Sequence, residues 1–113
     1  IVRQVANKSR TKVHIIQAVD KKLPFEDIER QNQLSRDELM DELDIIVSSG
    51  TKLDLQYYID TLVDENIQED IYDYFMKAPS DSFNDAYHAM KDDDFTVEEI
   101  QLVRLKFLSN VAN

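Results

Sequence analysis

The sequence of 113 residues contains no cysteine, one glycine and two prolines. Without cysteine, neither a disulfide framework nor a cysteine-ligated zinc site can form. A single glycine also excludes the phosphate-binding loop of the Gly-x-x-x-x-Gly-Lys type, which needs two. Because glycine and proline are the residues that most often interrupt helices, their scarcity favours a chain made mostly of helices.

Long apolar runs are missing as well. No stretch approaches the roughly 20 apolar residues that span a bilayer, and the N-terminus lacks the pattern of a signal peptide. We therefore expect a cytoplasmic protein without membrane contact. The length suits one domain with a single core. Because the chain begins with Ile1 rather than Met, we expect that it is a piece of a longer protein or that its first residues are missing from the sequence given.

Positive charge is scarce, since 13 basic residues stand against 23 acidic ones and give a net charge of −10. Such an acidic chain repels phosphates on average. The charge is unevenly distributed, however: residues 1–24 have six basic residues and one acidic residue, a balance of +5, and the remainder has −15. The basic segment is either an arm that contacts phosphate or an acidic neighbour, or a linker that its charges keep solvated.

Apolar residues recur at helical spacing in the first half of the sequence. They predict an amphipathic helix over residues 10–22, a short helix from Pro24 to about Gln31, and a third helix over residues 35–49. Ser35 and Glu38 have the spacing of a capping box, and Gly50 can end the third helix. The short helix, the turn and the long helix together predict a helix-turn-helix-like unit over residues 10–50.

The second half continues the helical pattern after residues 51–54, which we expect to be at most a very short extended segment. Its apolar stripes predict helices over 55–63, from about 67 to before Pro79, over 83–90 and over 96–111. The stripes include Leu55, Ile59, Leu62, Val63, Ile71, Phe75, Phe83, Ala86, Tyr87, Met90, Val97, Ile100, Val103, Phe107 and Val111. The expected fold class is all-α, a compact bundle of about six to seven helices.

Several runs of residues are more specific than a helical pattern. They are Lys-Val-His-Ile-Ile-Gln-Ala-Val-Asp at 12–20, Asp-Glu-Leu-Asp-Ile-Ile-Val at 41–47, Ser-Gly-Thr-Lys-Leu at 49–53, Tyr-Tyr-Ile-Asp at 57–60, and the run at 98–107. Together they resemble the domain at the extreme C-terminus of many bacterial RecQ helicases. The resemblance implies a linker or arm at 1–9 and a single helical accessory domain at 10–113, with a helix-turn-helix-like half at 10–63 and C-terminal helices at 64–113.

The resemblance also implies a parent enzyme that hydrolyses ATP, with magnesium, to unwind DNA in recombination and repair. Its motor would lie outside this fragment, because Asp64-Glu65-Asn66-Ile67 lacks the histidine of a helicase Asp-Glu-x-His box. We therefore expect no catalytic residue, no metal and no cofactor here. The expected partners are DNA and the rest of the helicase chain.

The third helix does not have the side chains of a DNA-reading helix. Its exposed positions are predicted to include Arg36 but also four carboxylates, which phosphates would repel. The four carboxylates are Asp37, Glu38, Asp41 and Asp44. In the alternative function, they form a face that docks on the parent helicase or on another protein. Weak, nonspecific contact with DNA phosphate is expected instead from the basic residues Lys8, Arg10, Lys12, Lys21, Lys22 and Lys52.

Other chemically suggestive residues have a simpler interpretation. The tyrosines at 57, 58, 72 and 74 could stack on bases, but they lack interleaved basic residues and are expected to pack in the core. His14 and His88 have no second ligand at metal-binding spacing and are expected on the surface. The acidic run at 92–94 lacks the glycine of a calcium loop and is predicted to be a solvated turn.

Overall fold

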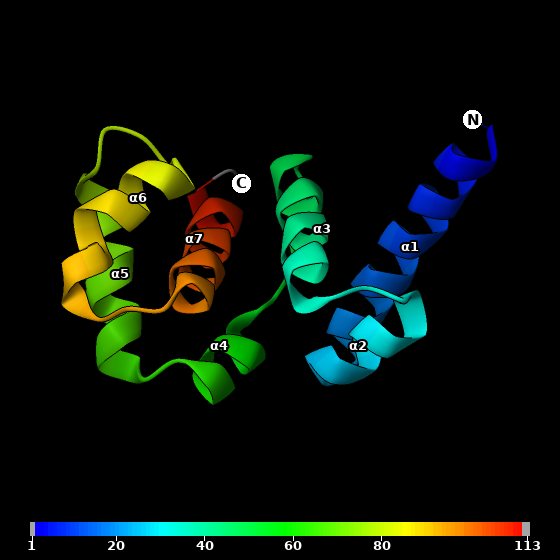
Figure 1. Ribbon diagram of the computed structural model, residues 1–113, viewed down its shortest axis with the longest axis horizontal. Coiled ribbons are helices and arrows are strands. Elements are labelled where there is room, and N and C mark those ends of the chain that lie inside the picture. The colour runs from blue at the N-terminus through cyan, green and yellow to red at the C-terminus, as the bar shows by residue number, and fades with distance from the viewer. Residues whose placement is uncertain (1, 112–113) are drawn as a thin grey trace. The chain divides into compact units, whose positions relative to one another are not determined.

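The structure is a computed structural model that describes the backbone of residues 2–111 and the side chains of residues 10–111. The described residues form seven α-helices and one short 3₁₀-helix, with no strand among them (Figure 1). The predicted all-α class is therefore confirmed. The chain divides into two compact units, residues 1–54 and 55–113.

The first unit contains helices α1 (Val2–Asp20), α2 (Phe25–Asn32) and α3 (Arg36–Ser48). Helix α2 packs against both α1 and α3. Helix α1 begins before the predicted start at residue 10, because residues 2–9 contain no glycine or proline to interrupt it. The side chains of the predicted arm at 1–9 lie outside the described residues. The buried apolar side chains of these helices are Ile15, Ala18, Val19, Phe25, Ile28, Leu39, Met40, Leu43, Ile46 and Val47.

The turn between α2 and α3 is set by local hydrogen bonds. Gln33 has a left-handed backbone with φ of 56°, which lets the N–H of Leu34 bond to the carbonyl of Glu29 at 2.9 Å. Ser35 and Glu38 then form the predicted capping box at the start of α3. Gly50, with φ of 95°, follows the end of α3, where its N–H bonds to the carbonyl of Val47 at 3.1 Å.

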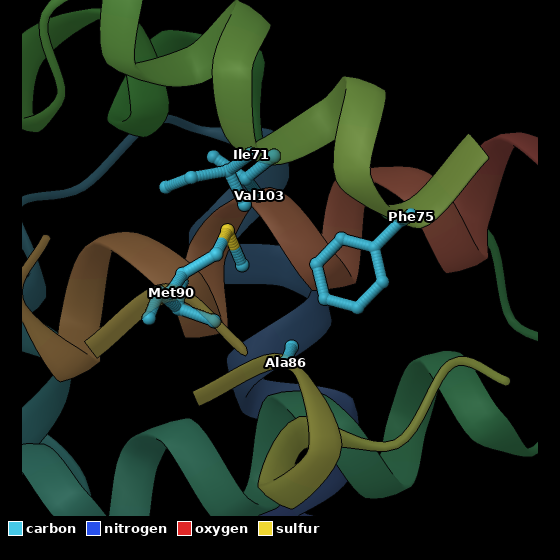
Figure 2. Close-up of a cluster of buried hydrophobic side chains, with 6 residues drawn as sticks. Ile71, Phe75, Ala86, Met90 and Val103 are labelled. Carbon is cyan, nitrogen blue, oxygen red and sulfur yellow. The ribbon is translucent and has the colours of Figure 1, made fainter. Parts of the chain in front are cut away.

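The second unit contains α4 (Gln56–Leu62), α5 (Glu65–Lys77), α6 (Phe83–Met90), the 3₁₀-helix η1 (Lys91–Asp93) and α7 (Val97–Val111). Helix α7 packs against α4, α5 and α6 and so lies at the centre of this unit. Because α4 packs with α7, the second unit begins at residue 55, earlier than the division expected after residue 63. Figure 2 shows the cluster of side chains buried where α5, α6 and α7 meet, Ile71, Phe75, Ala86, Met90, Ile100 and Val103.

Four apolar residues that the sequence assigns to buried stripes are exposed. Leu62 is the last residue of α4, and Val97 and Val111 are the first and last of α7, so each extends beyond the turns that pack. Tyr87 lies beside buried Ala86 but on the outer side of α6. The helical spacing of apolar residues predicted these helices correctly, but it assigned too many of their residues to the buried side.

Candidate interaction surfaces

The outward side of α3 is acidic. Asp37, Glu38 and Asp41 are exposed, and Asp44 is half-buried and accepts a hydrogen bond from the hydroxyl of Ser48 at 3.1 Å. Glu38 also has a structural role, because its Oε1 accepts from the backbone N–H of Ser35 at 2.9 Å in the capping box. The structure therefore brings the four predicted carboxylates onto one helix, and one of them also holds the start of that helix.

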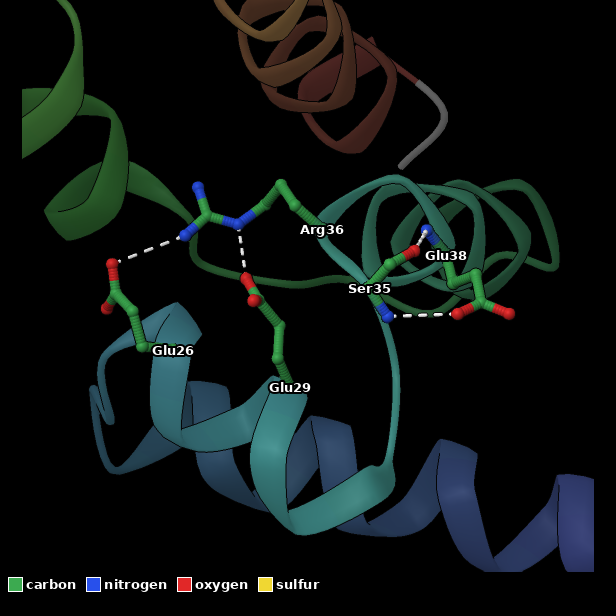
Figure 3. Close-up of polar contacts among 5 residues, drawn as sticks. All are labelled: Glu26, Glu29, Ser35, Arg36 and Glu38. Atoms are coloured by element: carbon green, nitrogen blue, oxygen red, sulfur yellow. Dashed lines mark hydrogen bonds and ion pairs between the residues drawn. The ribbon is translucent and has the colours of Figure 1, made fainter.

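Arg36 is not the freely exposed cation that the sequence predicts. Its guanidinium lies between two carboxylates of α2, donating from Nε to Glu29 and from Nη2 to Glu26 at 3.3 Å (Figure 3). The same group lies 5.1 Å from the centre of the Phe25 ring. With two opposite charges beside it and its side chain only 30% exposed, Arg36 joins α2 to α3 rather than facing a ligand.

Ile45 is a residue of this face that the sequence analysis missed. It is 59% exposed in the middle of α3, between buried Leu43 and Ile46. On a helix, Asp41 precedes it by one turn and Ser48 follows it by nearly one turn, so all three share a side. The sequence could have shown this exposure, because on a helical wheel Ile45 lies opposite the buried stripe of α3.

The predicted phosphate-contacting residues occupy different environments. Arg10, Lys21, Lys22 and Lys52 are exposed. The half-buried Lys12 donates from Nζ to the hydroxyl of Ser49 at 3.4 Å, beside the end of α3. Lys8 belongs to α1, but its side chain lies outside the described residues.

The basic side chains of α1 fall into two groups. Arg10 and Lys12 lie in the middle of the helix, and Lys21 and Lys22 directly follow its last residue, Asp20. At a rise of about 1.5 Å per residue, the groups are roughly 15 Å apart along the helix axis. Lys22 has φ of 59°, and its N–H bonds to the carbonyl of Val19 at 2.9 Å, which turns the chain at the end of α1. Among residues 10–22, the basic side chains therefore lie in two separate groups.

A comparison with protein families identifies this arrangement. Residues 9–59 match the model of the RecQ-1-like helix-turn-helix domain. These 51 of the 113 residues are similar in sequence to that domain. The match covers α1 from residue 9 onward, all of α2 and α3, and most of α4. No curated protein is significantly similar to the chain in sequence.

The first unit has a shallow hollow of about 510 Å³ on α1, lined by Arg10, Val13, His14 and Gln17. Val13 is 52% exposed there. Nδ1 of His14 lies 3.0 Å from Oδ1 of Asn32, so this half-buried histidine connects α1 to α2. His88, in the second unit, is exposed as predicted. Among residues 10–111, no group of three or more histidine, aspartate or glutamate side chains is arranged to hold a metal ion.

The four tyrosines differ in exposure. Tyr58, at the edge of the RecQ-1-like match, is buried. Burial raises the pKa of its hydroxyl to about 12, and the negative charge of ionised Tyr57 beside it makes a smaller contribution in the same direction. Tyr57 is 49% exposed and makes an edge-to-face contact with Tyr58. Tyr72 and Tyr74 are half-buried against Phe107 and Phe75. Packing in the core therefore accounts for three of the rings, and Tyr57 is the exception to that prediction.

The second unit, most of which lies beyond the RecQ-1-like match, has a hollow of about 870 Å³ between α4, α5 and α7. Gln68 lies at its base, donating from Nε2 to the carbonyl of Val63 at 2.8 Å. Lys106 lies 5.4 Å from the centre of the Tyr72 ring at the same hollow. The acidic side chains in the lining, which sequence analysis did not bring together, are Asp60, Asp64, Glu65, Glu69 and Asp73.

None of the described helices is both long enough and apolar enough to cross a membrane.

Proposed function

We propose that this chain is the accessory part of a RecQ-type DNA helicase and adds weak, sequence-independent contact with DNA phosphates through α1. The observation that carries the proposal is the exposure of Arg10, Lys21 and Lys22, while Arg36 of α3 is bound by two carboxylates. Exposed cations release counterions from DNA when they bind, which supplies most of the energy of nonspecific binding.

Charge argues against α3 as the DNA-contacting helix. In helix-turn-helix proteins that read DNA, the second helix of the motif lies in the major groove between two rows of phosphates. Here that helix would bring Asp37 and Asp41 toward the phosphates with no compensating cation of its own, because Arg36 is already paired. Contacts through α1 would position the domain on DNA without selecting a base sequence.

The parent enzyme forms part of the same proposal. A RecQ-type helicase uses ATP with magnesium to drive unwinding, and the residues for that chemistry would lie outside this chain. The placement at the C-terminus of a bacterial, cytoplasmic enzyme of recombination and repair rests on the resemblance of residues 12–60 and 98–107. Within such an enzyme, weak phosphate contact would keep the motor near its DNA between translocation steps.

Fluorescence anisotropy tests the proposed contact directly. Labelled single-stranded and forked DNA would be titrated with the protein from about 25 to about 200 mM salt. Two or three phosphate contacts predict a slope of log affinity against log salt of about −1.4 to −2.7, since each contact contributes about −0.7 on single-stranded and about −0.9 on duplex DNA. The variant R10Q/K21Q/K22Q should lose most of the binding and of the slope.

The matched control is R30Q/K77Q/K91Q, which removes the same charge from exposed residues away from the proposed contacts. It should keep nearly all of the affinity. Equal losses in the two variants would show that only net charge matters, and no binding by the unmodified protein at low salt would reject the proposed function.

A second candidate function is protein docking through the acidic face of α3. The exposed Ile45 favours it, because an apolar side chain amid carboxylates suits a protein surface better than a phosphate backbone. The partner would be the parent helicase or another protein with a basic surface.

A further inference from the structure

We infer that α1 bridges the two strands of duplex DNA across the major groove, with Arg10 on the phosphates of one strand and Lys21 on those of the other. This inference rests on the proposed function. It adds the kind of DNA that α1 contacts, which is duplex rather than single-stranded, and the direction in which the helix lies on it.

Arg10, Gln17 and Lys21 form one line along the exposed side of α1. All three are exposed, and their spacing of seven and four residues places them within about 40° of one another around the helix axis. The N–H of Lys21 donates to the carbonyl of Gln17 at 3.1 Å, so the helical path continues as far as Lys21. The other side of the helix carries the buried residues Ile15, Ala18 and Val19.

Both cations of this line are available to a ligand. Within residues 10–111, neither Arg10 nor Lys21 forms an ion pair. The arginines of α2 and α3 differ in this respect, because carboxylates of α2 bind both of them. Asp20 is exposed beside Lys21 in the sequence, but it lies about 100° away around the axis and so flanks the line.

The distance between the two cations suits the major groove of B-form DNA. At a rise of about 1.5 Å per residue, Arg10 and Lys21 are about 16 Å apart along the helix axis. The major groove is about 12 Å wide and the minor groove about 6 Å. Two cations at this distance therefore reach the phosphates on both walls of the major groove, whereas they extend well beyond the minor groove.

Between the two cations, this side of α1 is recessed and has no carboxylate and no further lysine or arginine. The shallow hollow lined by Arg10, Val13, His14 and Gln17 lies there. The open major groove likewise has no phosphate between its walls, so the charges of α1 match those across the groove. Because the groove is about 8.5 Å deep, Val13 and Gln17 do not reach its floor, and the contact remains independent of base sequence.

Single-stranded DNA fits this side of α1 less well. Proteins that bind single strands combine cations with aromatic rings on which the bases stack. Residues 10–21 include no tyrosine, phenylalanine or tryptophan, and the half-buried ring of His14 is bonded to Asn32. Because a single strand is flexible, a fixed distance between two cations also gives it no advantage over other distances.

The first experiment separates this inference from the proposed function. The protein would be titrated by fluorescence anisotropy, at low salt, with a labelled duplex and with one of its single strands. We expect the duplex to bind at least about fivefold more tightly. Equal or tighter binding of the single strand would overturn the inference and leave the proposed function standing, whereas no binding of either DNA would reject both.

A modified duplex tests where the contact lies. Cytosines that carry a glucosylated hydroxymethyl group at C5 fill the major groove with neutral groups and leave every phosphate in place. Affinity for this duplex should fall at least about tenfold, and the same modification in the single strand should change affinity by less than about twofold. Unchanged affinity for the modified duplex would overturn the bridge across the major groove, although contact with phosphate would stand.

Single variants test whether both ends of the bridge are needed. R10Q and K21Q should each weaken duplex binding about three- to tenfold, because each removes one phosphate contact. R30Q and K91Q remove the same charge from exposed residues outside the line and should change affinity by less than about twofold. Because a cation at the C-terminal end of α1 also favours the helix dipole, urea denaturation would check that K21Q is folded during the titration. Equal losses from R10Q and R30Q, or no loss from folded K21Q, would overturn the inference.

Discussion

Arg36 at the start of α3 donates its Nε hydrogen to Glu29 of α2, seven residues earlier in the chain. The contact joins the two helices of the helix-turn-helix pair and uses the only basic side chain of α3. To approach DNA, α3 would need positive charge, but the carboxylates of α2 neutralise the charge of Arg36.

Replacement of Arg36 by glutamine should leave DNA affinity within about twofold, because this guanidinium contributes little net charge to the surface. The same change should lower the free energy of unfolding by about 1 kcal/mol, since Glu29 loses a half-buried partner. Anisotropy and urea denaturation measure the two effects. A drop in affinity as large as that of K21Q would mean that Arg36 contacts DNA.

Replacement of Gln33 by glycine should stabilise the protein by about 0.5 to 1 kcal/mol. Gln33 has a left-handed backbone, which strains a residue with a Cβ atom but not glycine. The control is Q31G within α2, where glycine should instead cost about 1 kcal/mol. Urea denaturation of both variants provides the comparison. Equal destabilisation would show that the turn between α2 and α3 is not constrained as described.

Replacement of Ser35 by alanine should cost about 1 kcal/mol of stability, because the N–H of Glu38 loses its acceptor at the start of α3. Ser48, at the other end of α3, provides the control: S48A removes an exposed hydroxyl and should change stability by less than about 0.5 kcal/mol. Thermal unfolding followed by circular dichroism can rank the two. The reverse order would contradict the capping role of Ser35.

Tyr58 should make the protein sensitive to alkali. Its pKa is raised to about 12 by burial, so the folded state holds the proton more tightly than the unfolded state, where the pKa is near 10. The stabilising contribution is complete below pH 10 and is lost as the pH rises from 10 to 12, by about 1 to 2 kcal/mol. In Y58F this part of the alkaline loss should disappear. Parallel stability curves for the two proteins between pH 10 and 12 would contradict a buried hydroxyl.

The fold was largely predictable because its signals are local. The capping box at Ser35, Pro24 before α2 and Gly50 after α3 each act within one helical turn, and the structure confirms each of these boundaries. The start of α1 was the exception, since residues 2–9 have neither an apolar stripe nor a residue that stops a helix.

The interaction surfaces were less predictable because they depend on how helices pack. Helical spacing alone could not show that Arg36 reaches Glu26 and Glu29, since that contact needs the crossing of α2 and α3. Lys12 likewise contacts Ser49, 37 residues away. The exposure of Ile45 was readable from the helical wheel, yet the sequence analysis assigned this residue to no surface.

One pair of variants tests most directly whether α1 rather than α3 contacts DNA. R10Q/K21Q/K22Q and D37N/D41N/D44N would be titrated with the same labelled forked DNA at one low salt concentration. We expect the first variant to lose at least about tenfold in affinity, and the second to bind as well as the unmodified protein or somewhat better, because three repelling charges are gone. Loss of binding in the second variant, with the first unaffected, would contradict it and would place the DNA contact on α3.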